Sequence, residues 1–195
     1  RRVLRETPCD GNNDPAADRW MARVVEDFAA TMETLHGADG VLCPAGISTF
    51  GREIAYAPQR QATAFGAKAG EYLAPNLSPT PGTETGSALD VLQSYCRLDL
   101  TRIPNGAPLD LRLDAALRRH PEAEELQLAL LRHFIASTGF YLQIDTVDPE
   151  LLKRAQRDPD RYPNLVVRIS GWSARFASLD RTWQDMLIHR VALGL

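Results

Sequence analysis

The chain lacks three features that would direct the interpretation of a protein of this size. No run of residues approaches the roughly 20 consecutive apolar side chains that a membrane-spanning helix requires. Basic residues are outnumbered, because 22 lysines and arginines stand against 25 aspartates and glutamates, for a formal net charge of −3. The sequence therefore predicts no membrane association and no nucleic-acid binding driven by bulk charge.

Cysteine is scarce as well. The chain has three cysteines, widely spaced and without a Cys-x-x-Cys pair, which excludes a disulfide scaffold. We expect Cys43 and Cys96 to be buried as small apolar side chains, and Cys9 to be a loop thiol. The histidines are scattered without metal-ligand spacing, so we predict structural or surface roles for them and no metal site. They are His36, His120, His133 and His189.

The length of 195 residues predicts one domain with at most a small second lobe, and 44% hydrophobic residues are enough for a core. The chain begins at Arg1 rather than at methionine, and its first residues lack the apolar core of a signal peptide. We therefore expect a cytoplasmic protein, and we interpret the chain as the end of a longer polypeptide.

Apolar residues at helical spacing predict a first helix over 15–35, with Asp14 as its N-cap and a proline in its first turn. Further helices are predicted over 88–98, 121–137, 148–157 and 180–192. Alternation and β-rich composition predict strands over 107–113, 140–146 and 165–170. The succession of helix and strand from residue 121 onward predicts an α/β architecture.

Residues 37–92 are rich in glycine, proline and threonine and are predicted to form a long ordered loop. The short apolar runs 41–49 and 53–57 are its possible strands. Aromatic residues are interleaved through the segment, which is unusual for disordered chain. A long ordered loop in a compact domain usually has a functional reason.

The segment NLVVRISGWSARF, residues 164–176, contains an almost continuous apolar run before a glycine. Leu165, Val166, Val167 and Ile169 predict a strand that is buried on both faces. Gly171 follows it in a short aromatic-rich turn, where a glycine supplies backbone freedom or permits close approach of another segment. From these residues alone, the chain is a soluble α/β domain with a long ordered loop.

Residues 168–172, Arg-Ile-Ser-Gly-Trp, resemble the signature of the glycyl radical enzymes, the pyruvate formate-lyase superfamily. That signature reads Arg-Val-(Ser or Ala)-Gly-Tyr and is soon followed by a phenylalanine, here Phe176. Other segments of the chain are similar to family segments in the same order, and the chain is identified as a member of this superfamily. They are GNNDPAAD (11–18), AGEYLAPNLSPTPGTETG (69–86), AQRDPDRYPNL (155–165) and SLDRTWQDMLIHR (178–190).

The chain departs from the family pattern at several positions. Asn76 replaces a loop glycine, and we expect it to adopt a positive φ. Trp172 replaces the common tyrosine, and Asp145 stands where asparagine is frequent. Residues 62–67 lack the family's proline, aspartate and arginine, which argues against close membership of a well-studied subgroup.

The resemblance implies a part of an α/β barrel that ends in a C-terminal glycine loop. Residues 1–60 would form a helix and strand segment of the barrel, and residues 61–195 the glycine radical domain. Gly171 would be the catalytic residue that stores the radical, because loss of a Cα hydrogen leaves a planar centre that no side chain crowds. Oxygen quenches such a centre, so the resemblance implies anaerobic metabolism and a water-poor interior around Gly171.

No bound cofactor or metal is implied; a radical S-adenosylmethionine (radical SAM) activase with an iron–sulfur cluster would install the radical on Gly171. The radical would pass to a cysteine upstream of this chain, since Cys9, Cys43 and Cys96 do not match the family's cysteine loop. The resulting thiyl radical would cleave a C–C, C–O or C–N bond of a small-molecule substrate. The implied enzyme is a homodimer. It would be either a lyase or dehydratase, or a transferase of the formate C-acetyltransferase type.

Two alternatives remain open. The chain would otherwise be a non-catalytic spare-part radical subunit that complements an oxygen-cleaved partner enzyme, or an inactive relative or binding module in which no radical forms. Within the enzyme interpretation, the form of the segment after Gly171 favours a lyase or dehydratase. The substrate determinants are expected outside this chain.

Four polar residues are further candidates for the site. Ser48 and Thr49 are candidate polar groups of the pocket. Arg168 and Arg175 flank Gly171 and would either orient an anionic group or pair with acidic neighbours or with the activase surface.

Overall fold

The structure is a computed structural model that describes residues 6–35, 39–64, 66–139 and 141–192. His36, Phe65 and the first residue of the strand predicted over 140–146 lie outside these ranges. The helices are α2 (Pro15–Glu33), α3 (Glu53–Tyr56), α4 (Ala88–Cys96), α5 (Ala123–Ile135), α6 (Pro149–Arg157) and α7 (Arg181–Ala192). Short 3-10 helices cover Ala57–Gln59, Ala115–Arg119, Pro159–Arg161 and Phe176–Ser178.

The strands are β1 (Leu109–Arg112), β2 (Leu142–Asp145), β3 (Val166–Ile169) and β4 (Trp172–Arg175). β1 and β2 are parallel and are connected through α5, whereas β3 and β4 form an antiparallel hairpin. Among the described residues, the strands therefore form two separate pairs, and the predicted α/β class is confirmed. No described helix combines the length and the apolar character needed to cross a membrane.

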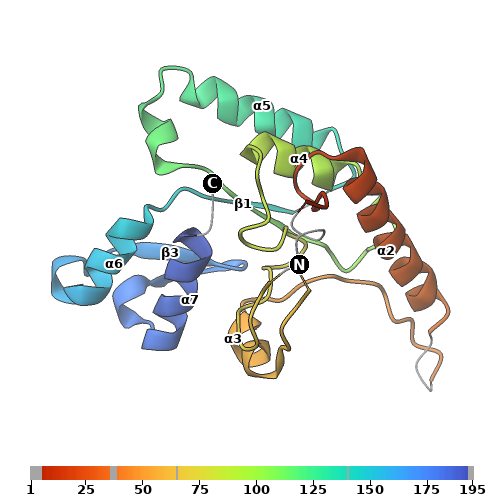
Figure 1. Cartoon of the computed structure of the whole chain (residues 1–195), viewed down its shortest axis with the longest axis horizontal. Helices are drawn as coiled ribbons and strands as arrows, with labels where there is room; N and C mark the ends of the chain where they lie inside the picture. Colours follow the sequence, from red (N-terminus) through yellow and green to blue (C-terminus); the bar gives the residue numbers. More distant parts are fainter. Residues whose placement is uncertain (1–5, 36–38, 65, 140, 193–195) are drawn as a thin grey trace.

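Two hydrophobic cores organise the chain. The first joins α2, α4, β1 and α5, with Leu92 and Leu109 fully buried in it. The second joins α6, β3 and α7 around Phe176 and Ile169. Figure 1 shows α6, β3 and α7 grouped on one side and α2, α4 and α5 on the other, with β1 running between them. The domain boundary between residues 60 and 61 stays a prediction.

The main predicted helices are confirmed, and polar side chains fix where they begin. The Asp14 carboxylate accepts hydrogen bonds from the Ala16 and Ala17 amides at the start of α2. Ser87 and Asp90 form a reciprocal capping box at α4. The Asp148 side chain caps α6 by accepting a hydrogen bond from the Glu150 amide. Pro149 is the first residue of this helix, as predicted.

Three predictions for irregular segments are wrong. Residues 41–49 form no strand, because Pro44 and Gly46 interrupt regular pairing. Instead, the backbone of this segment makes isolated hydrogen bonds with residues 105 and 106. Residues 53–57 are helical, since buried Glu53 and Ala57 are four residues apart. The turn after Gly171 is strand β4, whose backbone pairs with β3.

The Gly-Asn-Asn-Asp turn before α2 contacts the loop that precedes α4. Asn12 donates from Nδ2 to the Cys9 and Thr83 carbonyls, and its Oδ1 accepts from the Thr85 amide and hydroxyl. A Cβ on Gly11 would lie 2.2 Å from Cγ of Pro79. Two segments that are about 70 residues apart in the sequence therefore fit against each other at Gly11 and Asn12.

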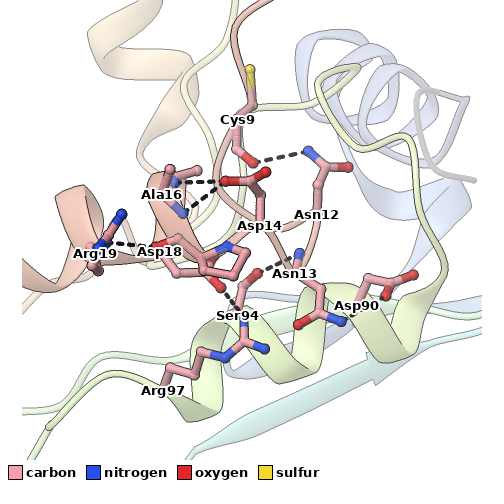
Figure 2. Close-up of polar contacts among 12 residues, drawn as sticks. Cys9, Asn12, Asn13, Asp14, Ala16, Asp18, Arg19, Asp90, Ser94 and Arg97 are labelled. Carbon is pink, nitrogen blue, oxygen red and sulfur yellow. Dashed lines mark hydrogen bonds and ion pairs between the residues drawn. The ribbon is translucent and has the colours of Figure 1, made fainter.

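The same turn is joined to helix α4, as Figure 2 shows. The Asn13 amide donates to Ser94 Oγ at 2.9 Å, and Asn13 Nδ2 lies 3.4 Å from an Asp90 carboxylate oxygen. Asp18, which is 3% exposed, forms an ion pair with Arg97 at the end of α4. Burial together with the nearby Asp18 charge raises the pKa of Asp10 to about 6.

Replacing Gly11 with alanine should destabilise the protein more than the same change at Gly82. Both glycines have a positive φ, +88° and +82°, so both alanines are strained by about 1–2 kcal/mol. Only Gly11 faces Pro79, and the overlap should add roughly 1–3 kcal/mol to the loss of unfolding free energy. Urea denaturation of Gly11→Ala and Gly82→Ala measures the difference. Equal losses would contradict the close contact.

The contribution of Asp10 to stability should fall as the pH rises from about 4 to about 6, because the folded state holds a proton on Asp10 that the unfolded chain releases at lower pH. One pKa unit corresponds to about 1.4 kcal/mol, so Asp10→Asn should stabilise the protein by roughly 1–3 kcal/mol at neutral pH. Urea denaturation at pH 4 and pH 7.5 tests this, with the exposed Asp160→Asn as control. An unchanged pH dependence in Asp10→Asn would contradict the raised pKa.

Candidate functional site

Gly171 lies at the tip of the β3–β4 hairpin. Ile169 pairs with Trp172, so Ser170 and Gly171 are the two residues of the turn. Gly171 has a φ of +94°, which favours glycine at this second position of the turn. Among the described residues other than Ser170 and Trp172, only the Tyr141 hydroxyl, at 3.7 Å, would lie within 4 Å of a Cβ on Gly171. The turn therefore requires glycine for its backbone conformation rather than for lack of space.

Gly171 is exposed in this chain, and the water-poor interior expected around it in the whole enzyme stays a prediction. The prediction of a strand buried on both faces is wrong in this chain. Val167 and Ile169 are buried, whereas Val166 is 55% exposed and Arg168 is exposed. The physical reason is that β3 belongs to a two-stranded hairpin whose one face packs on the second core while the other faces outward.

The base of the hairpin is firmly anchored. Phe176 is fully buried in the second core, and its amide donates to the Leu165 carbonyl at 2.8 Å. Gln184, on α7, is also buried and donates from Nε2 to the Phe176 and Leu179 carbonyls at 3.1 Å each. The phenylalanine after the glycine and the glutamine of the last helix therefore hold the hairpin against α7.

The tip of the hairpin contacts strand β2. The Gly171 amide donates to Gln143 Oε1 at 3.2 Å, and Gln143 Nε2 donates to Asp145 Oδ2 at 3.0 Å. Arg190, from α7, has Nη2 at 3.7 Å from the same carboxylate oxygen and donates to the Arg168 carbonyl at 3.2 Å. Polar side chains thus connect Gly171 to β2 and connect β2 back to β3.

Charged groups are concentrated on the face of β1 and β2 opposite the first core. Asp110 pairs with Gln143 and Arg112 with Asp145 in the parallel register. Burial raises the pKa of both aspartates and lowers the pKa of Arg112, while the Arg190 charge opposes part of the rise at both aspartates. Several buried polar atoms in this region have no hydrogen-bond partner among the described residues. They are Asp110 Oδ1, Arg112 Nη1, Ser170 Oγ and Arg190 Nη1.

The two arginines that flank Gly171 are both exposed. Arg168 donates from Nη1 to the Ser173 hydroxyl across the hairpin at 3.1 Å. The Arg175 carbonyl accepts a hydrogen bond from the Ser178 hydroxyl. Trp172 is 42% exposed and stands edge-on to Trp183, with 5.7 Å between ring centroids. The roles predicted for Arg168 and Arg175, towards an anionic group or an activase surface, stay predictions.

Ser48 and Thr49 are held by Asn76. The Ser48 hydroxyl and the Thr49 amide both donate to Asn76 Oδ1, at 2.9 and 3.0 Å. Asn76 has a φ of +51°, which confirms the prediction that it adopts a positive φ. Its Nδ2 donates to Asp110 at 2.7 Å, so this loop also contacts the charged face of β1.

The cysteines give no sign of a common site. Cys43 is exposed, so its predicted burial is wrong; it precedes Pro44 in a segment at the surface. Cys9 and Cys96 are half-buried. The described residues hold no group of three or more histidine, cysteine, aspartate or glutamate side chains placed to bind a metal ion.

Three residues around Gly171 were missed by the sequence interpretation. Gln143 is a buried polar residue between Leu142 and Ile144 in a predicted strand, and that pattern was the available signal. Asp145 was noted only as a departure from the family pattern. Arg190 carried no signal, because only the packing of α7 brings it 3.7 Å from Asp145.

The comparisons with known proteins point to one family. The model of the family described as "Glycine radical" matches residues 73–177. "Probable dehydratase YbiW" of Escherichia coli strain K12 is 30% identical over 97% of this chain and 24% of its own length. "Formate acetyltransferase 1" of the same strain is 29% identical over 95% of this chain and 25% of its own length.

A solved glycyl radical enzyme from Archaeoglobus fulgidus superposes with a TM-score of 0.87 at 28% identity, over all of this chain and 25% of that one. The chain therefore spans about a quarter of the length of these relatives. Because the family model covers more than half of the chain, including the hairpin with Gly171, the chain belongs to the glycyl radical enzyme family.

Proposed function

We propose that this chain is the C-terminal part of an oxygen-sensitive glycyl radical enzyme and that Gly171 stores its radical. The observation that carries the proposal is Gly171 itself, an exposed glycine of positive φ at the tip of an anchored hairpin inside the segment matched by the family model. Glycine has no side chain to crowd a planar Cα. A radical at this Cα is shared with the flanking amide and carbonyl.

The proposed cycle begins with an activating enzyme of the radical SAM type. It removes one hydrogen atom from the Gly171 Cα, and the glycyl radical remains. That radical takes a hydrogen atom from a cysteine thiol in the remainder of the enzyme, which restores the glycine Cα–H and leaves a thiyl radical. The thiyl radical abstracts a hydrogen atom from the substrate, and the substrate radical then breaks its C–C, C–O or C–N bond. The cysteine thiol returns the hydrogen atom to the product radical, which leaves the thiyl radical again. Each transfer needs reacting atoms about 3–3.5 Å apart, so placement of the hairpin tip is the contribution of this chain.

The proposed reaction is radical cleavage of a C–C, C–O or C–N bond in a small metabolite. The names of the relatives support two classes: a dehydratase, which is a lyase, and a formate acetyltransferase. We favour the lyase or dehydratase class. A homodimer in the cytoplasm is part of the proposal.

The hairpin tip with Gly171 is exposed in this chain, which spans about a quarter of its relatives' length. Trp172 and Val166 add exposed apolar surface beside it, at 42% and 55% exposure. In the assembled enzyme, this surface would meet the remainder of the barrel, which would also supply the cysteine.

A second candidate is a separate radical-bearing subunit that completes an oxygen-cleaved partner enzyme. It is favoured by the anchoring of the hairpin, whose base is held by Phe176 and Gln184 of this same chain. A continuous reading frame that carries the family's cysteine loop upstream of this segment would rule it out.

Anaerobic activation of the natural polypeptide that carries this chain should produce an organic radical. With a matching activase, S-adenosylmethionine and reductant, electron paramagnetic resonance should show a doublet, split by the remaining α-hydrogen. Gly171→Ala should abolish the signal, and glycine deuterated at Cα should collapse the doublet. Gly70→Ala is the matched control, because Gly70 also has a positive φ, +83°, and its Cβ position is open.

Silence from folded protein, with an activase that activates a glycyl radical relative in parallel, would overturn the proposal in favour of an inactive relative. A doublet that survives in Gly171→Ala would place the radical on another residue.

A further inference from the structure

We propose that Gln143 is a positioning residue for Gly171, and that Asp145 and Arg190 fix the direction in which its amide points. The inference rests on the proposed role of Gly171 and adds the side chains that hold its backbone. It comes from one continuous set of contacts that runs from the hairpin tip to β2 and back to β3.

The side-chain amide of Gln143 has one acceptor end and one donor end. An ionised carboxylate only accepts hydrogen bonds, so Asp145 Oδ2 at 3.0 Å takes the Nε2 donor. The carbonyl oxygen Oε1 is then left facing the Gly171 amide at 3.2 Å. A reversed amide would point NH₂ at an N–H group, and Asp145 would face a carbonyl oxygen.

The Asp145 side chain is 11% exposed. Burial alone would favour the protonated acid, which could present a donor to Gln143 and remove the preference. The Arg190 guanidinium, 6% exposed and 3.7 Å away, favours the carboxylate. Arg190 also donates to the Arg168 carbonyl, three residues before Gly171, so the same side chain is attached to the hairpin that Gln143 holds.

These contacts fix the Gly171 N–H bond towards β2, and with it the direction of the Cα–H bonds on the same residue. A planar Cα radical shares its unpaired electron with this amide, so an acceptor at the N–H group also changes the spin distribution. Gln143 therefore affects both where the hydrogen atom is transferred and how the radical is distributed.

Asp145 gives the arrangement its direction, because an ionised carboxylate accepts hydrogen bonds at both oxygens and donates none. An asparagine has its own donor and acceptor and needs a further partner to orient it. Here the carboxylate and the buried Arg190 supply the orientation together.

The experiment compares Gln143→Met with Gln156→Met in the natural polypeptide that carries this chain. Methionine keeps the length of the side chain and removes both hydrogen bonds. Gln156 is the matched control because it is bound to Asp185, away from Gly171. Hydrogen–deuterium exchange at the Gly171 amide, followed by mass spectrometry at single-residue resolution, should be roughly three- to tenfold faster in Gln143→Met, which corresponds to the loss of one hydrogen bond.

Electron paramagnetic resonance of the activated protein supplies a readout that a merely structural role would not move. In Gln143→Met we expect an altered line shape and roughly three- to tenfold less radical per chain. Gln156→Met should match the unsubstituted protein in both measurements.

A double variant guards against misfolding of Gln143→Met. In Gln143→Glu combined with Asp145→Asn, the new carboxylate accepts from the Gly171 amide, and the new asparagine donates to it and accepts from Arg190. The charge of the cluster is unchanged. Compared with Gln143→Met, the double variant should regain both slow exchange at the Gly171 amide and the radical signal. If Gln143→Met is unfolded, the double variant is compared with the unsubstituted protein and should match it.

The two proposals fail in different ways. Absence of a radical in the unsubstituted protein, with a competent activase, overturns the proposed function. A normal radical together with unchanged exchange and line shape in Gln143→Met overturns the positioning role of Gln143. A normal radical with a double variant that folds but exchanges fast and loses the signal overturns the claim that an acceptor at position 143 positions Gly171.

Discussion

The burial of Phe176 beneath the β3–β4 hairpin is the constraint on which the candidate site depends. A two-stranded hairpin is marginally stable by itself, so its position must come from packing at its base. Phe176 supplies that packing, and Gln184 satisfies the carbonyls at which the chain leaves the hairpin. The tip can then be open and exposed, because its position is determined several residues away.

The two cores of the chain meet through polar contacts. The inner faces of β1 and β2 pack into the first core, while Asp110, Gln143 and Asp145 lie on the opposite face, towards the hairpin. A polar contact surface of this kind needs good geometry, since each lost partner leaves a buried charge. Side-chain hydrogen bonds are directional, so they specify the placement of Gly171 more narrowly than apolar packing would.

The loops of the first half of the chain fit together by close approach. Gly11 leaves room for Pro79, and Asn12 satisfies the backbone of the loop that leads to α4. Asn76 binds Ser48, Thr49 and Asp110 in a similar way. Long irregular segments are thereby fixed with little regular secondary structure, which is why composition alone describes them poorly.

The sequence by itself determined the α/β class, the main helices, the strand before Gly171 and the positive φ of Asn76. These depend on local chemistry: Asp14, Ser87 and Asp148 cap helices through backbone groups within three residues. Only the tertiary structure decided that residues 53–57 are helical, that β4 follows Gly171, that β3 exposes one face, and that Gln143, Asp145 and Arg190 converge on the hairpin. These features depend on which distant segments come into contact, and a side chain's own neighbours in the sequence carry no record of that contact.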